Sequence, residues 1–158
     1  MEYQRPDTTM TLEQGLIEYY GDRDDLVTGR GASAQAREFF RCHDVAHVVF
    51  GCGTTLPQEA VVKIWSFFGT TAGLGLLRDY RLPESQEIYD TLRFNDIVAT
   101  IGFALVHIPI VLVRCLRMRQ RWPWSDFESY VSMPLVDIRQ EFGILVVEVR
   151  SRTPKAAV

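Results

Sequence analysis

The sequence predicts an all-α protein, built as a single compact helical domain of about six helices with at most one short C-terminal strand. Helix-capping patterns open most of the apolar segments. Glycines follow several of these segments at the point where a helix would end. Only the run "ILVVEV" (residues 144–149) has the composition of a strand. A lone strand has no partner with which to form a sheet, so helices must make up the core.

The length and composition suit one domain. The chain has 158 residues, of which 47% are hydrophobic and 23% charged, as is ordinary for a globular protein. We expect the whole chain, residues 1–158, to be one domain with a folded core over 10–150. Residues 1–9 and 151–158 are expected to be tails.

The first two helices have clear boundaries. The capping box "TLEQ" (residues 11–14) opens a helix that continues through Tyr20. Residues 21–32, "GDRDDLVTGRGA", are polar and glycine-rich and are expected to form a loop. Ser33 then begins a longer helix, which a glycine ends directly after Phe50.

The middle of the chain contains the most apolar segment. "TLPQ" (residues 55–58) opens a helix that is expected to continue toward Leu77, and another helical segment begins at Pro83. From Ile97 to Val113 there are 17 residues without Asp, Glu, Lys or Arg. This favours a buried core helix kinked at Pro109, and a membrane span is the alternative because the length is at the lower limit for one.

Two short helices are expected after this segment. "SDFE" (residues 125–128) is a further capping box, and the helix that it opens is interrupted at Pro134. A last helix is expected from Pro134 to Phe142, with Gly143 as its C-terminal stop.

Charge is unevenly distributed along the chain. The net charge of −3 gives no support for a nucleic-acid partner, but residues 114–158 carry 8 basic and 5 acidic side chains, a balance of +3. Arginines and tryptophans lie together at the start of this part. They can be a solvated helix end, or an anchor on a membrane surface in which arginines bind phosphates and indoles lie among headgroups. The membrane interpretation assigns this role to Arg114, Arg117, Arg121, Trp122 and Trp124.

The three cysteines, Cys42, Cys52 and Cys115, make an odd number without a repeated spacing. The first 25 residues hold seven carboxylates and no apolar stretch typical of a signal peptide. We therefore expect reduced thiols and a cytoplasmic protein, peripheral at the inner face of a bacterial membrane.

Four ionisable residues in an apolar segment form the candidate site. On a helix of about 100° per residue, His43, Asp44 and His47 project at about 0°, 100° and 40°, so all three lie on one face. Glu59 follows in the first turn of the next helix, which a hairpin would bring back beside His47. Two imidazoles with one or two carboxylates suit zinc best and also suit iron. A shared ion would also remove the cost of burying these groups without partners.

The two histidines also fit a structure without a metal, because histidine pairs at this spacing occur as hydrogen-bonded core groups. His107 is predicted to be a core histidine because it is alone in its apolar run. A zinc protease requires a glutamate where Asp44 stands, and an HD-type phosphohydrolase requires histidines that are further apart, so both fit poorly.

The pattern His43-Asp44-x-x-His47, followed after eleven residues by Glu59, resembles the signature of the coenzyme Q (ubiquinone) biosynthesis protein 4 family. The resemblance covers residues 37–68 well, and the segment 125–144 faintly. Arg41, Gly51, Lys63 and Trp65 around the motif also match.

The resemblance implies a helical, often dimeric protein that rests on a membrane, handles a polyprenyl lipid and organises other quinone-biosynthesis proteins. It implies that His43, Asp44, His47 and Glu59 are metal ligands. Two functions remain open: a metal-dependent enzyme acting in oxidative decarboxylation of a prenylated hydroxybenzoate ring, and a non-catalytic lipid-binding scaffold with a structural metal. The catalytic residues of the first are unknown.

Overall fold

The computed structural model describes residues 1–21, 33–76 and 94–147, and the fold in these ranges is all-α, as predicted. Five α-helices are defined there, and no β-strand occurs in them. Three short 3-10 helices are also defined, one before α1 and two between later α-helices. The α-helices are α1 (Leu12–Tyr20), α2 (Ala34–Phe50), α3 (Leu56–Gly69), α6 (Phe94–Arg117) and α7 (Leu135–Phe142), and the 3-10 helices are η1 (Glu2–Gln4), η2 (Gly73–Gly75) and η3 (Glu128–Tyr130). The helical start expected at Pro83 lies outside the described residues.

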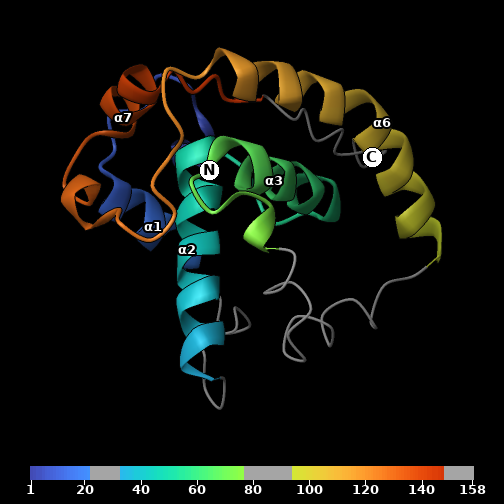
Figure 1. Cartoon of the computed structure of the whole chain (residues 1–158), viewed down its shortest axis with the longest axis horizontal. Helices are drawn as coiled ribbons and strands as arrows, with labels where there is room; N and C mark the ends of the chain where they lie inside the picture. The colour runs from blue at the N-terminus through green and yellow to red at the C-terminus, as the bar shows by residue number, and fades with distance from the viewer. Residues whose placement is uncertain (22–32, 77–93, 148–158) are drawn as a thin grey trace, which may run out of the picture.

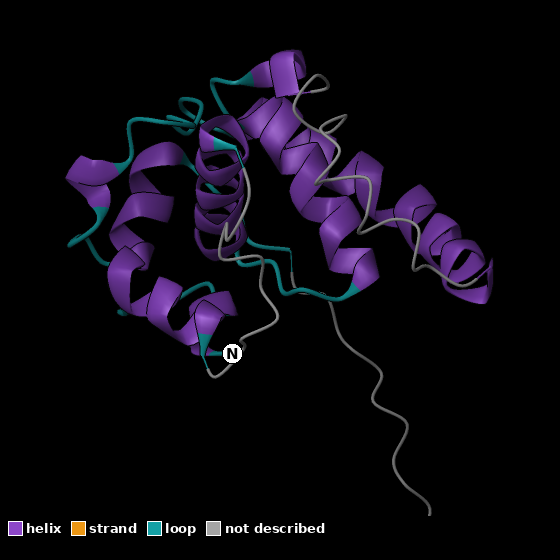
Figure 2. Ribbon diagram, turned by 90° about the horizontal axis from the view of Figure 1, so that it is seen from below, coloured by secondary structure: helices purple, strands orange, loops and turns teal. Residues whose placement is uncertain are grey.

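Helix α2 is the centre of the fold. It packs on α1 on one side and on α3 on the other, while α6 arches over α3 (Figure 1). The view from below shows the same order, with α6 running along the outside of the molecule (Figure 2). Helix α7 closes the end of the domain where α2 terminates. This arrangement brings the first turn of α3 back beside the second half of α2.

The helix boundaries follow local chemistry at most ends. The Thr11 side chain accepts a hydrogen bond from the Gln14 backbone, and Ser33 does the same for Ala36. Helix α3, by contrast, ends at Gly69 and not near Leu77 as predicted. The reason is tertiary: the Gly69 carbonyl accepts a hydrogen bond from the Trp122 backbone at 2.8 Å, and Thr70 forms a parallel bridge with Trp122.

Both tryptophans proposed for a membrane surface lie in the core, so that part of the sequence prediction is wrong. Trp122 is fully buried and Trp124 is 8% exposed. The Trp122 ring packs between Tyr130 and Phe142, with ring centroids 5.1 and 5.0 Å away. An indole buries a large apolar area, and here aromatic neighbours from α7 and η3 cover it.

The N-terminal residues are packed on the domain and are not the tail expected over residues 1–9. Tyr3 is fully buried, and its hydroxyl donates to the Cys52 carbonyl at 3.0 Å. The buried guanidinium of Arg139 in α7 donates to the carbonyls of Tyr3 and Arg5. It also donates to Val48 and Val49 at the end of α2. One cation therefore joins the N-terminus, α2 and α7. The other expected tail, 151–158, lies outside the described residues.

The expected strand does not form over its described part, residues 144–147. Ile144, Val146 and Val147 are buried nevertheless. The guanidinium of Arg114 donates to the carbonyls of Leu145 and Val146, which satisfies these two groups without a sheet.

Helix α6 leaves one apolar face uncovered where its side chains are described. Val106, Ile110, Val113 and Leu116 are between 39% and 86% exposed, although Val111 is fully buried against the core. The described part of this segment is therefore not the core helix that the sequence predicted. Pro109 lies within it. Among the described residues, no helix is long and apolar enough to cross a membrane.

Gly51 ends α2, and we expect Gly51→Ala to destabilise the protein. Its φ is +68°, and an added Cβ would lie 2.6 Å from Val146 Cγ1. The left-handed backbone alone costs a non-glycine residue about 1–2 kcal/mol, and the clash adds to this. Urea unfolding of Gly51→Ala and Gly73→Ala separates the two effects, because Gly73 also has a positive φ but no neighbour within 4 Å. Equal losses in the two variants would show that the clash contributes nothing.

Candidate metal centre

Two imidazoles and one carboxylate converge between α2 and α3. His43 and His47 lie one turn apart on α2, and their Nε2 atoms are 3.2 Å apart. Glu59 lies in the first turn of α3. Its Oε2 is 3.4 Å from His43 Nε2, and its Oε1 is 3.1 Å from His47 Nε2. The hairpin between the two helices thus produces the contact that the sequence predicted for Glu59.

These distances fit a metal ion. The ligand atoms of a tetrahedral zinc site with bonds of 2.0–2.1 Å are separated by about 3.3–3.4 Å. The three separations here, 3.2, 3.4 and 3.1 Å, are close to that value. His43, His47 and Glu59 each offer a ligand atom, and these atoms lie within 4.8 Å of one another. The donor set therefore fits a divalent ion.

Burial and the neighbouring charges determine the protonation states of His43 and Glu59. His47 is fully buried and His43 is 9% exposed. Burial lowers the pKa of His43, and the hydrogen bond to Glu59 offsets this only in part, so His43 favours the neutral form that binds metals. Burial alone would raise the pKa of Glu59, but the adjacent imidazoles of His43 and His47 outweigh it and lower that pKa. Glu59 is therefore ionised at neutral pH.

The orientation of His47 comes from the turn after α2. Its Nδ1 lies 3.3 Å from the carbonyl oxygen of Cys52, which can only accept, so Nδ1 carries the proton. In the neutral imidazole the lone pair is then on Nε2, which faces Glu59. The backbone N–H of Cys52 in turn donates to the His47 carbonyl at 2.8 Å. A backbone contact of this kind sets the tautomer of a metal-binding histidine.

Asp44, the fourth predicted ligand, is placed beside the cluster but does not join it. The group of close ligand atoms found among the described residues contains His43, His47 and Glu59 only. The Asp44 carboxylate faces α1 instead, where Oδ2 accepts a hydrogen bond from the Tyr20 hydroxyl at 3.0 Å. Burial raises the pKa of Asp44, while the nearby histidines and tyrosines partly oppose that shift. The structure thus unites three of the four predicted residues.

Comparison with known proteins finds two curated relatives that match part of the chain. Both are described as "Ubiquinone biosynthesis protein COQ4 homolog, mitochondrial", one from Leishmania infantum and one from Leishmania major. Each is 43% identical to this chain over 37 residues, which are 23% of this chain and 20% of the relative. Part of the chain is similar to COQ4 homologues. No family model matches, and no solved structure matches.

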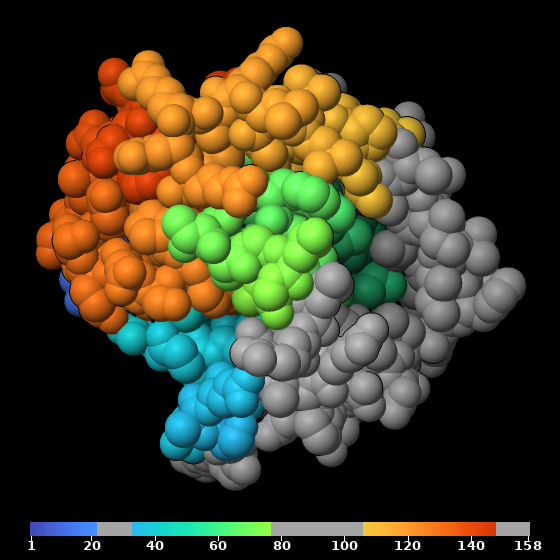
Figure 3. All heavy atoms as spheres, in the orientation of Figure 1, coloured from blue at the N-terminus to red at the C-terminus, as the bar shows by residue number. Residues whose placement is uncertain are grey.

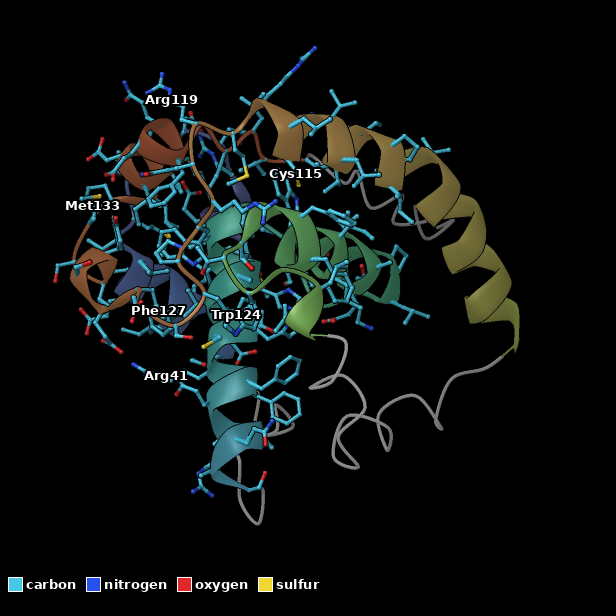
Figure 4. The ribbon with its side chains drawn as sticks, viewed as in Figure 1. Arg41, Cys115, Arg119, Trp124, Phe127 and Met133 are labelled. Atoms are coloured by element: carbon cyan, nitrogen blue, oxygen red, sulfur yellow. The ribbon has the colours of Figure 1, made fainter. Side chains whose placement is uncertain are left out.

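Two other residues that match the COQ4-family pattern have structural contacts away from the cluster. The Arg41 guanidinium pairs with Glu128 and lies 4.9 Å from the centre of the Phe127 ring, so it attaches α2 to η3. Arg41 and Phe127 lie together on one flank of α2 (Figure 4). Trp65 is fully buried and stacks on Phe50 with ring centroids 4.6 Å apart.

The tyrosines that surround the site were not predicted from the sequence. Tyr19 is 2% exposed and its ring lies 5.1 Å from that of His47, while Tyr20 binds Asp44. Burial raises the pKa of both phenols, which therefore stay protonated, and Tyr20 donates to the carboxylate. The signal in the sequence is the pair of adjacent tyrosines at the end of a capped helix, but the packing of that helix against α2 is not visible there.

Proposed function

We propose that the chain is a ubiquinone-biosynthesis-like protein that binds a divalent metal and a polyprenyl lipid or prenylated aromatic acid. The observation that carries the proposal is the convergence of His43, His47 and Glu59 at distances suited to one ion. The similarity to COQ4 homologues supports the pathway, although the chain spans only about a fifth of their length.

His43, His47 and Glu59 would hold the ion, with zinc as the first candidate and iron as the second. The ion would supply a Lewis acid that binds the carboxylate or phosphate of a lipid head group. The chain's own contribution is orientation: the Cys52 carbonyl holds the His47 ring, and the apolar walls of α1 and α2 exclude water. In this proposal the reaction is oxidative decarboxylation of a prenylated hydroxybenzoate ring, in which the ring carboxylate leaves as CO2, a hydroxyl takes its place, and an external two-electron oxidant such as O2 is reduced.

A scaffold role is the second candidate, because His47 has no exposed surface and His43 very little. Structural zinc sites are typically closed to solvent. In that case the metal would hold α2 against α3, and the protein would act as a lipid-binding homodimer that assembles other quinone-biosynthesis proteins.

The membrane surface is proposed to lie along the uncovered face of α6. Val106, Ile110, Val113 and Leu116 are exposed there, and arginines follow them at positions 114, 117, 119 and 121. Residues 106–121 contain no acidic side chain. In the space-filling view this part of the chain forms the upper rim of the molecule, beside α3 (Figure 3). An apolar stripe that ends in arginines suits an interface with anionic lipids.

Replacing Arg117 and Arg121 with glutamine should weaken binding to anionic vesicles roughly 30-fold, because each arginine at such a surface contributes about 1 kcal/mol. Arg114 is retained since it holds the backbone at Leu145 and Val146. Vesicle co-sedimentation measures the effect. The double change of Arg5 and Arg37 to glutamine removes the same charge elsewhere and is the control. Equal binding by the two variants would contradict the assignment.

The function itself is tested by elemental analysis of the purified protein, with mass spectrometry of the lipid that co-purifies. About one zinc or iron per chain together with a polyprenyl species is the expected result, and iron would favour the oxidative enzyme. Protein prepared without chelator that contains no metal would refute the metal site. Metal without any prenyl lipid would refute the assignment to the quinone pathway.

A further inference from the structure

Two adjacent tyrosines at the end of α1 hold the one predicted ligand that the cluster leaves out. The Tyr20 hydroxyl donates to Asp44 Oδ2 at 3.0 Å, and burial together with the charge of the same carboxylate raises the pKa of the adjacent Tyr19 phenol. Tyr19 is 2% exposed and also packs on the His47 ring. The pair therefore connects α1 to Asp44, beside the cluster, and to His47, within the cluster.

The position of α1 depends on close helix packing. Gly15 faces α2, and a Cβ added there would lie 2.6 Å from Val48 Cγ1. Tyr19 follows Gly15 by one helical turn, so the same close approach brings its ring onto α2. Directly before Tyr19, the Glu18 carboxylate accepts hydrogen bonds from the backbone of Glu2 and Tyr3. The phenols are thus presented to Asp44 from a helix that is held at several points.

The Tyr20 hydrogen bond occupies Asp44 Oδ2 and directs the carboxylate toward α1. A phenol that donates to a carboxylate forms a charge-assisted bond, which is roughly twice as strong as one between neutral groups. His43, His47 and Glu59 already present three ligand atoms within 4.8 Å, and Asp44 is not among that group. A fourth protein ligand would close the site, whereas three leave one position open, as in catalytic zinc sites.

We propose that Tyr19 and Tyr20 are positioning residues that hold Asp44 outside the coordination shell, so that an ion bound by His43, His47 and Glu59 keeps a position open for an anionic oxygen ligand. This inference rests on the proposed metal function. It assigns the open position to a carboxylate or phosphate oxygen of the substrate. It also replaces the expectation that Asp44 is itself a ligand.

The test compares wild type with Tyr19→Phe/Tyr20→Phe, which keeps both rings and removes only the hydroxyls. Each protein is loaded with Co²⁺, and its visible spectrum is recorded during a titration with benzoate. Zinc affinity is measured in parallel by competition with a chelator. We expect benzoate to shift the wild-type spectrum, and the double variant to lose this response and to bind zinc more tightly because Asp44 joins the ion.

Two Asp44 variants complete the cycle. Asp44→Ala alone should bind zinc as tightly as wild type and keep the benzoate response. Adding Asp44→Ala to the double variant should restore the response. Loss of zinc from Asp44→Ala, or an unchanged benzoate response in the tyrosine variant, would overturn the inference while leaving the metal function intact. A wild-type protein that binds neither ion would overturn both, and thermal unfolding of the apo forms shows whether each variant is folded.

Discussion

Replacing His47 with alanine is expected to remove zinc from the protein. His47 supplies one of three ligand atoms, and it is the one whose orientation the Cys52 carbonyl determines. Loss of an outer-shell partner alone lowers metal affinity about 10–100-fold, so loss of a ligand should exceed 100-fold. Chelator competition followed by elemental analysis measures the change.

Because His47 is fully buried, its removal also leaves a gap between α1, α2 and α3. Glu59→Gln is therefore the second variant, since it keeps the shape of the side chain and removes its charge. His107→Ala is the matched control, because His107 is the remaining histidine and lies on α6 away from the cluster. Full metal content in His47→Ala and Glu59→Gln would show that the two side chains are a hydrogen-bonded core pair.

Replacing Arg139 with methionine is expected to lower the free energy of unfolding by at least about 3 kcal/mol. The guanidinium is 3% exposed and donates to four carbonyls, those of Tyr3, Arg5, Val48 and Val49. Each buried carbonyl that loses its donor costs about 1–3 kcal/mol. Burial lowers the pKa of Arg139 to about 10, so the group is still charged at neutral pH. Urea unfolding followed by circular dichroism measures the loss.

Arg139→Lys should not restore stability, since an ammonium has three donors for four carbonyls and lacks the planar fork of arginine. Arg119→Met is the control, because Arg119 is an exposed arginine beside α7 whose backbone N–H, not its side chain, bonds to Phe142. If Arg139→Met and Arg119→Met unfold at the same urea concentration, the four hydrogen bonds contribute little.

Periodicity and capping made much of the structure predictable. Once the segment is a helix, His43 and His47 lie on the same face because they are four residues apart. Ser33 and Gly51 show where that helix begins and ends. Glu59 could be placed beside His47 because a glycine-containing turn and a second predicted helix follow directly. These are short-range effects, in which each residue acts on backbone a few positions away.

Longer-range packing could not be predicted in the same way. The composition around Trp122 and Trp124 is typical of a membrane interface, yet both indoles pack on aromatic residues from other elements. Nothing near Arg139 in the sequence indicates that it binds the carbonyls of Tyr3 and Arg5, more than 130 positions away. The end of α3 at Gly69 likewise depends on Trp122.

Side-chain type and helical spacing are enough to predict most of the helices, the N-caps Thr11 and Ser33, and the residues that can bind a metal. Which of those residues meet depends on how the helices pack. Packing brings His43, His47 and Glu59 together and directs Asp44 to Tyr20, since α1 lies against α2 closely enough for the phenols to reach the carboxylate. The orientation of the Asp44 carboxylate is thus set by the packing of α1 against α2.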